Sequence, residues 1–333
     1  MRYVRIDEGS EGQRLDNFLV KLLKGVPKTH LYRVIRSGEV RVNKGRADAA
    51  TRLALGDEVR VPPVRIAERA DSRAAPPREF HVVFEDEHLL AIDKPAGVAV
   101  HGGSGVSFGV IEQLRQARPD ARFLELVHRL DKETSGLLLI AKKRSSLVAL
   151  QDQLRVHQGD KVIGKTYAAL VVGAWPERRR VIDVALHKFL TPGGERRVHA
   201  VGAEADHDTG RRAITLVRVA RRFDGFTLLD VTIKTGRTHQ IRVHLTHEGF
   251  ALVGDAKYGD FALNKAIARG DAVPGAAFAR MFLHARELRF THPASGEVLT
   301  LVAPLPAECD ALLRVLPASH GLPAIASAAP LSR

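Results

Sequence analysis

A single cysteine, Cys309, is all that the 333-residue chain contains. One thiol excludes a disulfide framework and any zinc site built from cysteines. Long apolar runs are also missing, since the best uninterrupted one, residues 136–141, has the length of a strand and is far too short to cross a bilayer. Residues 1–16 alternate charged with apolar residues and hold no apolar block of the kind found in a signal peptide. We therefore expect a soluble, cytoplasmic protein from a reducing compartment, with no membrane partner.

Composition places the chain among folded proteins. Hydrophobic residues make up 45% of it and charged residues 27%, which are ordinary globular proportions. These values argue against disorder throughout the chain. With 333 residues, the chain is long enough for two domains and too long for one small core held by disulfides or metal.

Positive charge is in excess and unevenly spread. Lys and Arg number 51 against 38 Asp and Glu, a net charge of +13. Residues 1–79 hold 17 basic and 11 acidic residues, hence +6, and the other 254 residues carry only +7. Such a surplus favours a polyanionic partner, either nucleic acid or an anionic membrane surface. A solvated basic face is the simpler alternative, so charge alone leaves RNA or DNA binding open.

Two short helices and a few strands are predicted in residues 14–62. Apolar residues recur at helical spacing over 15–22, and a second helix, capped by Thr29 and ended by Gly38, carries the next apolar stripe. A turn at 43–45 joins short strands. The basic residues that this arrangement leaves outward are Lys28, Arg33, Arg36, Arg41, Lys44 and Arg46. Basic side chains on a rigid scaffold can follow a phosphate backbone without reading bases, so we predict a small α/β RNA-binding domain.

Composition divides the remaining chain into three parts. Residues 63–79 are rich in Pro, Ala and Arg with almost no aromatic residues, which is typical of a linker. A larger domain follows over residues 80–316. Residues 317–333, rich in Ala, Pro and Ser, are predicted to be a disordered tail.

Strand patterns dominate the larger domain. Strand-like segments are 80–84, 89–92, 136–142, 167–172, 229–233, 281–290 and 298–302. Helical spacing appears over 108–114 and 147–154, and Asp224-Gly225 is a hairpin turn signal. Strands outnumber helices and cluster as hairpins. We therefore predict an α+β fold with a mixed, mostly antiparallel sheet and flanking helices, rather than a doubly wound one.

Residues 159–166 match the phosphate-loop pattern letter for letter. That loop binds phosphates only when a strand enters it and a helix leaves it. Here a helical pattern enters and a strand pattern leaves, which disfavours a nucleotide triphosphatase. The glycine-rich stretch 101–105 lacks dinucleotide-binding spacing and carries no assignable chemistry by itself.

Three of the fifteen histidines lie close together in sequence, at positions 239, 244 and 247. No Asp or Glu accompanies them at ligand spacing, and Arg237 and Arg242 among them would repel a cation. We predict no metal site.

The densest cluster of polar residues spans residues 126–136, between apolar runs. Asp131 in this segment precedes a buried strand, where a carboxylate needs hydrogen bonds or a cation. One interpretation is that it caps the turn at 134–136. The other is a reactive carboxylate whose cationic partner comes from 234–244. Both interpretations stay open on these residues alone.

The same segment resembles the signature of the RluA-type pseudouridine synthases. Several separate motifs carry the resemblance, and they lie in the same order as in the family. Along the chain they are Asp93-Lys94-Pro95-Ala96-Gly97, His128-Arg129-Leu130-Asp131, Thr134-Ser135-Gly136, Lys165-Thr166-Tyr167, the run 236–244, Gly254-Asp255, Tyr258-Gly259 and Leu283-His284-Ala285. The N-terminal module is similar to the small RNA-binding domain first described in a small-subunit ribosomal protein. Residues 101–111 are closest to the subgroup that acts on large-subunit ribosomal RNA. The segment 197–210 departs from the family in being longer and more acidic, and we expect it to lie away from the RNA groove.

The resemblance implies that Asp131 is the catalytic carboxylate and that Arg242 holds it ionised. The reaction breaks the glycosidic bond of a uridine, turns the uracil and rejoins it through carbon 5. Asp131 would act either as a nucleophile or as a base. Nothing is oxidised or hydrolysed overall, so the resemblance implies no cofactor.

The resemblance also assigns residues to the substrate. The target uridine leaves its stack to reach the carboxylate, and Arg129 fills the vacated place through its planar cation. Tyr167 lies beside the base as a third catalytic-site residue, and Leu283 packs near it. His128 is expected to contact RNA or support the fold rather than to react.

The function predicted from the sequence is therefore the isomerisation of specific uridines in 23S (large-subunit) ribosomal RNA. The expected partner is ribosomal RNA and not DNA, and the expected state is a monomer. The alternative is a non-catalytic RNA-binding or ribosome-assembly factor on the same scaffold. Which uridines are modified does not follow from short motifs, because RNA shape and surface contacts select them.

Overall fold

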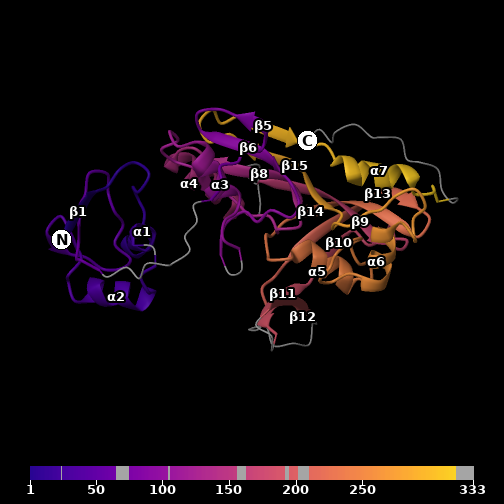
Figure 1. The fold of residues 1–333 in the computed structure, drawn as a ribbon, viewed down its shortest axis with the longest axis horizontal. Coiled ribbons are helices and arrows are strands. Elements are labelled where there is room, and N and C mark those ends of the chain that lie inside the picture. The colour runs from indigo at the N-terminus through magenta and orange to yellow at the C-terminus, as the bar shows by residue number, and fades with distance from the viewer. Residues whose placement is uncertain are drawn as a thin grey trace.

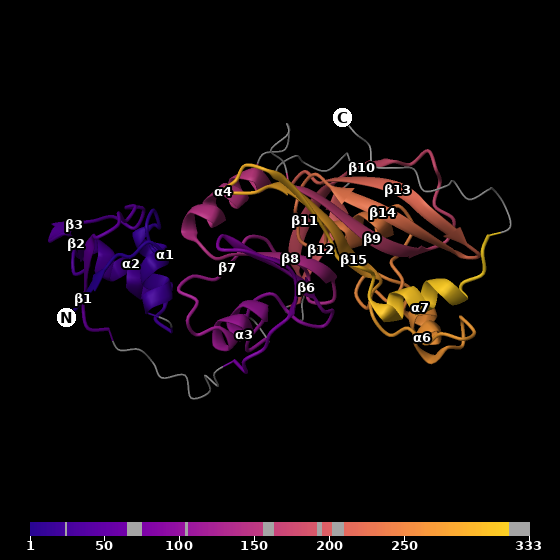
Figure 2. The ribbon, with the colours of Figure 1, turned by 90° about the horizontal axis from the view of Figure 1, so that it is seen from above.

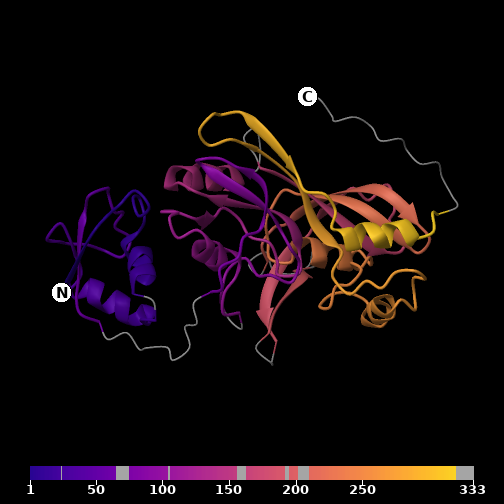
Figure 3. The same cartoon turned by 45° about the horizontal axis from the view of Figure 1, so that its top comes forward.

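The computed structural model describes residues 1–23, 25–64, 75–103, 106–155, 163–191, 195–201 and 210–319. A small N-terminal module lies at one end of the molecule, beside a larger unit built on one long sheet (Figure 1, Figure 3). The two touch through an ion pair between Lys21 Nζ and Glu125 Oε1 at 2.5 Å. No described helix is both long enough and apolar enough to cross a membrane.

The N-terminal module has its own hydrophobic core. Its elements are β1 (Arg2–Arg5), α1 (Leu15–Leu22), α2 (Lys28–Arg36), β2 (Arg41–Val42), β3 (Gly45–Arg46) and β4 (Glu58–Val61). The sheet order is β1-β4-β2-β3, and all pairs are antiparallel. Leu15, Leu19 and Leu31 from the helices pack on Val40 and Val59. The packed unit also includes β1 and so extends N-terminal to residue 14.

Local signals in this module are mostly confirmed. Asn43 and Lys44 have φ of 49° and 68° and form the two-residue turn between β2 and β3, as a hairpin of this length requires. Gly38, with φ of 76°, follows α2 directly. The predicted cap at Thr29 is wrong, because α2 already begins at Lys28 after Pro27. The fixed φ of proline sets that start, and Thr29 lies inside the first turn.

The larger unit contains a sheet of ten strands. The main path is β10-β13-β14-β9-β15-β8-β6-β5, with β16 beside β15 and β7 beside β8. Their bounds are β5 (His81–Glu85), β6 (Leu89–Lys94), β7 (Glu125–Leu126), β8 (Ser135–Ala141), β9 (Gly164–Val172), β10 (Val181–Asp183), β13 (Ile214–Phe223), β14 (Phe226–Ile233), β15 (Leu283–Thr291) and β16 (Val298–Val302). Only the β15–β8 pair is parallel among the described strands, which confirms the predicted mostly antiparallel α+β fold. A separate hairpin of β11 (Ala185–Leu190) and β12 (Arg196–Val201) projects from this unit (Figure 1).

Helices cover both faces of the sheet (Figure 2). They are α3 (Val110–Ala117), α4 (Arg144–Arg155), α5 (Gln240–His247), α6 (Phe261–Arg269) and α7 (Ala307–Val315). The strand β8 is buried along its whole length and supplies two cores. Leu138 and Ile140 pack on the side of α3 and α5, while Leu137 and Leu139 pack on the side of α4. Alternation along a strand sends successive side chains to opposite faces.

One glycine fixes the centre of the sheet. Gly136 has φ of 109°, and a Cβ atom there would lie 2.3 Å from the carbonyl oxygen of Ala285. The absence of a side chain therefore lets β8 approach β15 closely. This junction positions the loop that leads into β8, which carries Asp131.

Candidate active site

A cavity of about 450 Å³ opens on the face of the sheet that α5 covers. It is bounded by the loop before β8, the start of β9 and the loop that leads into α5. The sequence-predicted residues that line it are His128, Arg129, Asp131, Tyr167, Arg242 and Leu283. Residues far apart in sequence therefore meet in one cavity, which is large enough for a nucleoside-sized ligand.

Asp131 lies in the loop between β7 and β8, with one fifth of its side chain exposed. Its Oδ2 lies 3.4 Å from Nη1 of Arg242 and 4.0 Å from Nε2 of His239. The turn that follows is closed by the backbone, because Thr134 donates its N–H to the carbonyl oxygen of Asp131 at 3.2 Å. Among the described residues the carboxylate caps no turn. The geometry therefore favours the interpretation of a carboxylate aimed at a cavity and paired with a cation.

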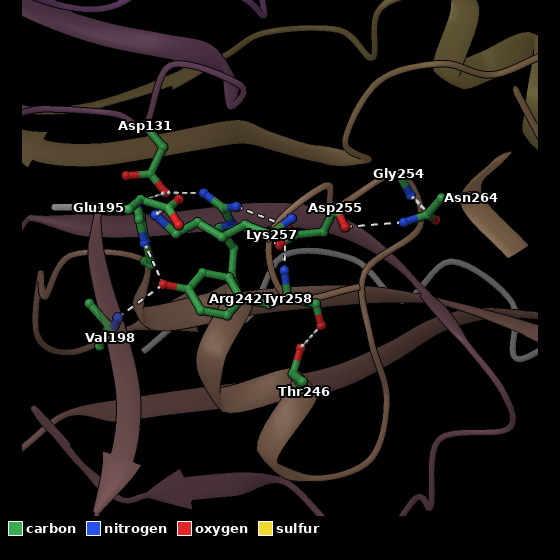
Figure 4. A network of polar contacts seen from close by, with 11 residues as sticks. Asp131, Glu195, Val198, Arg242, Thr246, Gly254, Asp255, Lys257, Tyr258 and Asn264 are labelled. Carbon is green, nitrogen blue, oxygen red and sulfur yellow. Dashed lines mark hydrogen bonds and ion pairs between the residues drawn. The ribbon is translucent and has the colours of Figure 1, made fainter. Parts of the chain in front are cut away.

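Arg242 is held in place by a second carboxylate. Its Nε and Nη2 donate to Oδ2 and Oδ1 of Asp255, each at 2.8 Å, which leaves Nη1 facing Asp131 (Figure 4). Burial disfavours the charged guanidinium, but the hydrogen bonds and charge of Asp255 and the charge of Asp131 outweigh it and raise the pKa of Arg242. Burial also disfavours the Asp255 carboxylate, yet Arg242 lowers its pKa overall. The sequence motif contained Asp255, but no role had been predicted for it.

The loop of Asp255 is itself tightly held. Asp255 Oδ1 accepts the backbone N–H groups of Lys257 at 2.8 Å and Tyr258 at 3.0 Å. Asn264 donates to the carbonyl oxygen of Asp255 and accepts the N–H of Gly254 (Figure 4). A bidentate pair on a fixed loop orients the guanidinium with little freedom.

Tyr258 connects this loop to the projecting hairpin. Its ring lies 5.1 Å below the Arg242 guanidinium. Its hydroxyl accepts the N–H of Val198 from β12 at 3.1 Å (Figure 4). The same oxygen lies 2.8 Å from Nδ1 of His239. No role for Tyr258 follows from the sequence, because neither partner is near it along the chain.

Tyr167 enters the cavity from β9, and Leu283 enters it from β15. Burial, and then the charge of Asp131, raise the pKa of the Tyr167 phenol. The phenol is therefore protonated at neutral pH and can donate a hydrogen bond. Leu283 is 3% exposed and belongs to the core that includes Tyr167.

Comparison with known proteins agrees with this geometry. Residues 88–247 match the family model for RNA pseudouridylate synthase, and residues 13–59 match the S4 domain. "Ribosomal large subunit pseudouridine synthase C" of Salmonella typhimurium is 45% identical, with 95% of this chain and 97% of that protein covered. The protein of the same name from Yersinia pestis is 47% identical, with 92% of each chain covered. The chain belongs to the RNA pseudouridine synthase family.

Solved structures agree with this assignment. "Human RNA Pseudouridylate Synthase Domain Containing 4" is 25% identical, with a TM-score of 0.56 over 71% of this chain and 92% of that one. As a member of the family the protein is an isomerase with an N-terminal S4 domain, as the sequence resemblance predicted.

The remaining predicted residues of the synthase lie in two places. Arg129 is exposed at the edge of the cavity, whereas His128 is half-buried and faces β8. His128 Nε2 accepts the N–H of Leu139 at 3.1 Å, and burial lowers its pKa to about 3, so the ring is a neutral acceptor. The predicted RNA-contacting residues of the S4 domain do not line the cavity and are exposed at Lys28, Arg33, Arg36 and Lys44.

The phosphate-loop pattern and the histidine cluster each have a place in the fold. Residues 159–162 of the phosphate-loop pattern lie outside the described residues, and Lys165 and Thr166 belong to β9. A strand therefore leaves this segment, as predicted. His244 uses both ring nitrogens, on Thr215 Oγ1 at 2.9 Å and the carbonyl oxygen of Val184 at 3.0 Å. Within the described ranges no three potential metal ligands cluster.

Proposed function

We propose that this pseudouridine synthase isomerises specific uridines of large-subunit (23S) ribosomal RNA, with Asp131 as the catalytic carboxylate. One observation supports this proposal most strongly. The Asp131 carboxylate is one-fifth exposed in the cavity and lies 3.4 Å from Arg242, which Asp255 holds in place. The names of the relatives, "Ribosomal large subunit pseudouridine synthase C", support the choice of RNA. The relatives and this chain cover each other almost completely.

The chemistry requires a flipped uridine in the cavity. The C1′–N1 bond breaks, the uracil turns and a C1′–C5 bond forms. C5 then gives up its proton and N1 takes one up, so that the product is an isomer of the substrate. Asp131 contributes either by attacking the ribose or by removing a ribose proton, and in both roles the carboxylate must be negative. The guanidinium of Arg242 stabilises that negative charge at 3.4 Å.

The other lining residues act on the base and the strand. Tyr167 provides an aromatic face for stacking and a protonated hydroxyl. Leu283 closes the apolar side of the cavity. Arg129, which is exposed at the edge of the cavity, takes the place that the uridine vacates, where its planar cation can stack on the neighbouring bases. His128 supports this loop from the β8 side.

The S4 domain provides sequence-independent attachment. Lys28, Arg33, Arg36 and Lys44 are exposed, and none forms an ion pair with a carboxylate among the described residues. Such cations are available for phosphates. We propose the division into an RNA-binding domain at 14–62, to which β1 adds an edge strand, a linker at 63–79, a catalytic domain at 80–316 and a tail. The enzyme works as a monomer on RNA rather than DNA, in the cytoplasm where its substrate is assembled.

Pseudouridine mapping tests the choice of RNA. Pseudouridines are mapped in 23S and 16S ribosomal RNA from cells that lack this protein and from the same cells complemented with the wild-type chain. We expect specific 23S positions to lose pseudouridine and regain it on complementation. An unchanged 23S map, or losses confined to other RNAs, would contradict the proposed substrate.

A further inference from the structure

Lys165 is a cation of the cavity wall for which the described part of the chain supplies no partner. Lys165 lies in β9, two residues before Tyr167 and therefore on the same face of the sheet. It lines the cavity, and among the described residues its ammonium group has no hydrogen bond or ion pair. The fully buried Lys94 is different, because its Nζ donates to the carbonyl oxygens of Pro95, Val98 and Lys132 at 2.8–3.2 Å.

An unpaired ammonium group in this position is costly. Burial lowers the pKa of Lys165 to about 8, so most of these side chains still carry a charge at neutral pH. Lys165 is half-buried, and a charge taken out of water without a counter-charge destabilises the folded protein. Such a feature at a cavity wall indicates that a ligand supplies the missing partner.

The surroundings show which end of the cavity the ammonium occupies. The negative charge of Asp131 acts on the pKa of Tyr167, whereas burial alone sets that of Lys165. Lys165 lowers the pKa of His128, and its Nζ lies 3.6 Å from the point where a side chain on Gly236 would begin. The ammonium is therefore beside His128 and the glycine of the 235–239 loop.

We propose that Lys165 is a positioning residue that binds a backbone phosphate next to the flipped uridine. The inference rests on the proposed function and adds a contact to the substrate. A phosphodiester carries the full negative charge that the ammonium lacks, and lysine binds phosphate as a point charge. A neutral uracil carbonyl would leave the positive charge buried and uncompensated. Besides Arg242, three arginines line the same cavity and favour an anionic strand there: Arg129, Arg237 and Arg155, of which Arg155 also pairs with Asp152.

Holding this phosphate fixes the strand at one end of the cavity while Asp131 meets the ribose at the other. Lys165 therefore acts on substrate binding more than on the chemical step. We expect Lys165→Met to raise KM about 10- to 100-fold, the effect of losing one charge-assisted contact, with the single-turnover rate at saturating RNA within about 3-fold. Lys165→Arg restores most of the affinity.

The test pairs these variants with altered RNA. The substrate is a synthetic RNA fragment around a uridine whose conversion by the wild-type enzyme has been mapped, with one uncharged methylphosphonate at each flanking linkage in turn. We expect one linkage at which the wild-type enzyme loses affinity and Lys165→Met loses nothing further. Lys143→Met is the matched control, because Lys143 is a surface residue paired with Glu87 and does not line the cavity. Its response to every linkage follows that of the wild type.

A second readout separates substrate binding from a structural role. Because Lys165→Met removes an unpaired buried charge, we expect the Tm of the free enzyme to rise by about 2–4 °C. The KM of the wild type should also rise as the pH passes about 8, whereas that of Lys165→Met stays flat.

The inference is overturned if every linkage weakens wild type and Lys165→Met alike, or if the variant loses its rate at saturating RNA with KM unchanged. A lower Tm for Lys165→Met would show a structural role instead. These outcomes are distinct from failure of the proposed function, in which the wild-type enzyme converts no uridine of unmodified 23S RNA.

Discussion

Two carboxylates bind one guanidinium in this enzyme, and their different exposure to solvent explains their different roles. Asp255 is 1% exposed and accepts hydrogen bonds from two of the three guanidinium nitrogens of Arg242, each at 2.8 Å. Asp131 is one-fifth exposed and takes the third at 3.4 Å. The buried carboxylate holds the arginine, and the exposed one is left accessible to substrate.

Replacing Asp255 tests this division. Asp255→Asn keeps the shape but removes the charge, so Arg242 is left partly unpaired in a buried site. We expect a loss of about 3–5 kcal/mol in the free energy of unfolding and a fall of at least about 100-fold in pseudouridine formation. Denaturant unfolding and single-turnover assays measure the two effects. A fully active, fully stable Asp255→Asn enzyme would contradict the assigned role.

The same pair predicts a pH dependence. The pKa of Asp255 is lowered in the folded protein, so its contribution to stability is present above the unfolded-state value of about 3.9 and is lost as the pH falls through the lower folded value. The difference in unfolding free energy between wild type and Asp255→Asn should therefore be constant from pH 5 to pH 7 and shrink below about pH 4. A difference that grew on acidification would exclude this account.

The Tyr258 hydroxyl provides a smaller test at the same scale. In Tyr258→Phe the N–H of Val198 loses its acceptor, while the ring can stay over Arg242. We expect a cost of about 1–3 kcal/mol in unfolding free energy, because a buried donor is left unsatisfied, together with slower pseudouridine formation. Tyr32→Phe in α2 is the control, since its hydroxyl contacts Asp16 in the S4 domain. Equal rates for the two variants would show that the link to the hairpin has no effect on catalysis.

Elements with a clear apolar period could be predicted from the sequence, and those without one could not. The uninterrupted apolar run of β8 and the helical stripe of α1 both produced the expected structure. Helix α5 was missed because its residues 240–245 are all buried, so no amphipathic pattern marks it. The residue that precedes the helix, His239, is in a left-handed conformation with φ of 53°, which is not one of the common start signals. The position of Arg242 opposite Asp131 depends on this helix.

Substitution of Gly136 tests the close approach of β8 to β15. In Gly136→Ala a Cβ atom would lie 2.3 Å from the carbonyl oxygen of Ala285, at a φ of 109°. We expect a loss of more than about 3 kcal/mol, since both strain and a backbone clash must be relieved. Gly225→Ala is the matched control, because it has φ of 72° but nothing within 4 Å of the added atom, and it should cost about 1 kcal/mol. Similar thermal unfolding of the two variants would contradict the proposed close approach of β8 and β15.

On the scale of the whole molecule, apolar spacing and charge predicted a small basic RNA-binding module, and strand patterns predicted a larger α+β domain after a linker. The charge excess alone left nucleic acid and an anionic membrane surface open as partners, and the resemblance to the pseudouridine synthases pointed to ribosomal RNA, Asp131 and Arg242. The supporting residues Asp255 and Tyr258 could not be assigned, because their partners lie on other elements and only the fold brings them together. Lys165 could not be assigned because only the fold shows that it lines the cavity. The predicted acidic segment lies outside the described residues over 202–209.

The two domains are expected to have separate roles, in which the S4 domain binds RNA and the catalytic domain isomerises the uridine. A variant with Gln at Lys28, Arg33, Arg36 and Lys44 keeps the α2 backbone but removes four exposed charges. We expect weaker RNA binding and a salt dependence of log K reduced by about 3, with the single-turnover rate at saturating RNA within about 2-fold. Fluorescence-based RNA titrations from 50 to 200 mM salt measure the slope. As the control, Gln at Lys265, Arg269 and Arg314, which are exposed on α6 and α7, should change the slope less.

The most direct measurement is single-turnover pseudouridine formation by purified Asp131→Ala and Asp131→Asn on 23S ribosomal RNA, with RNA affinity measured on the same samples. Without this carboxylate we expect the rate to fall at least about 10⁴-fold, while the Kd for RNA changes by less than about 3-fold because the cations that bind phosphate are untouched. Pseudouridine formed by either variant at a rate near that of the wild type would contradict the central claim that Asp131 performs the chemistry.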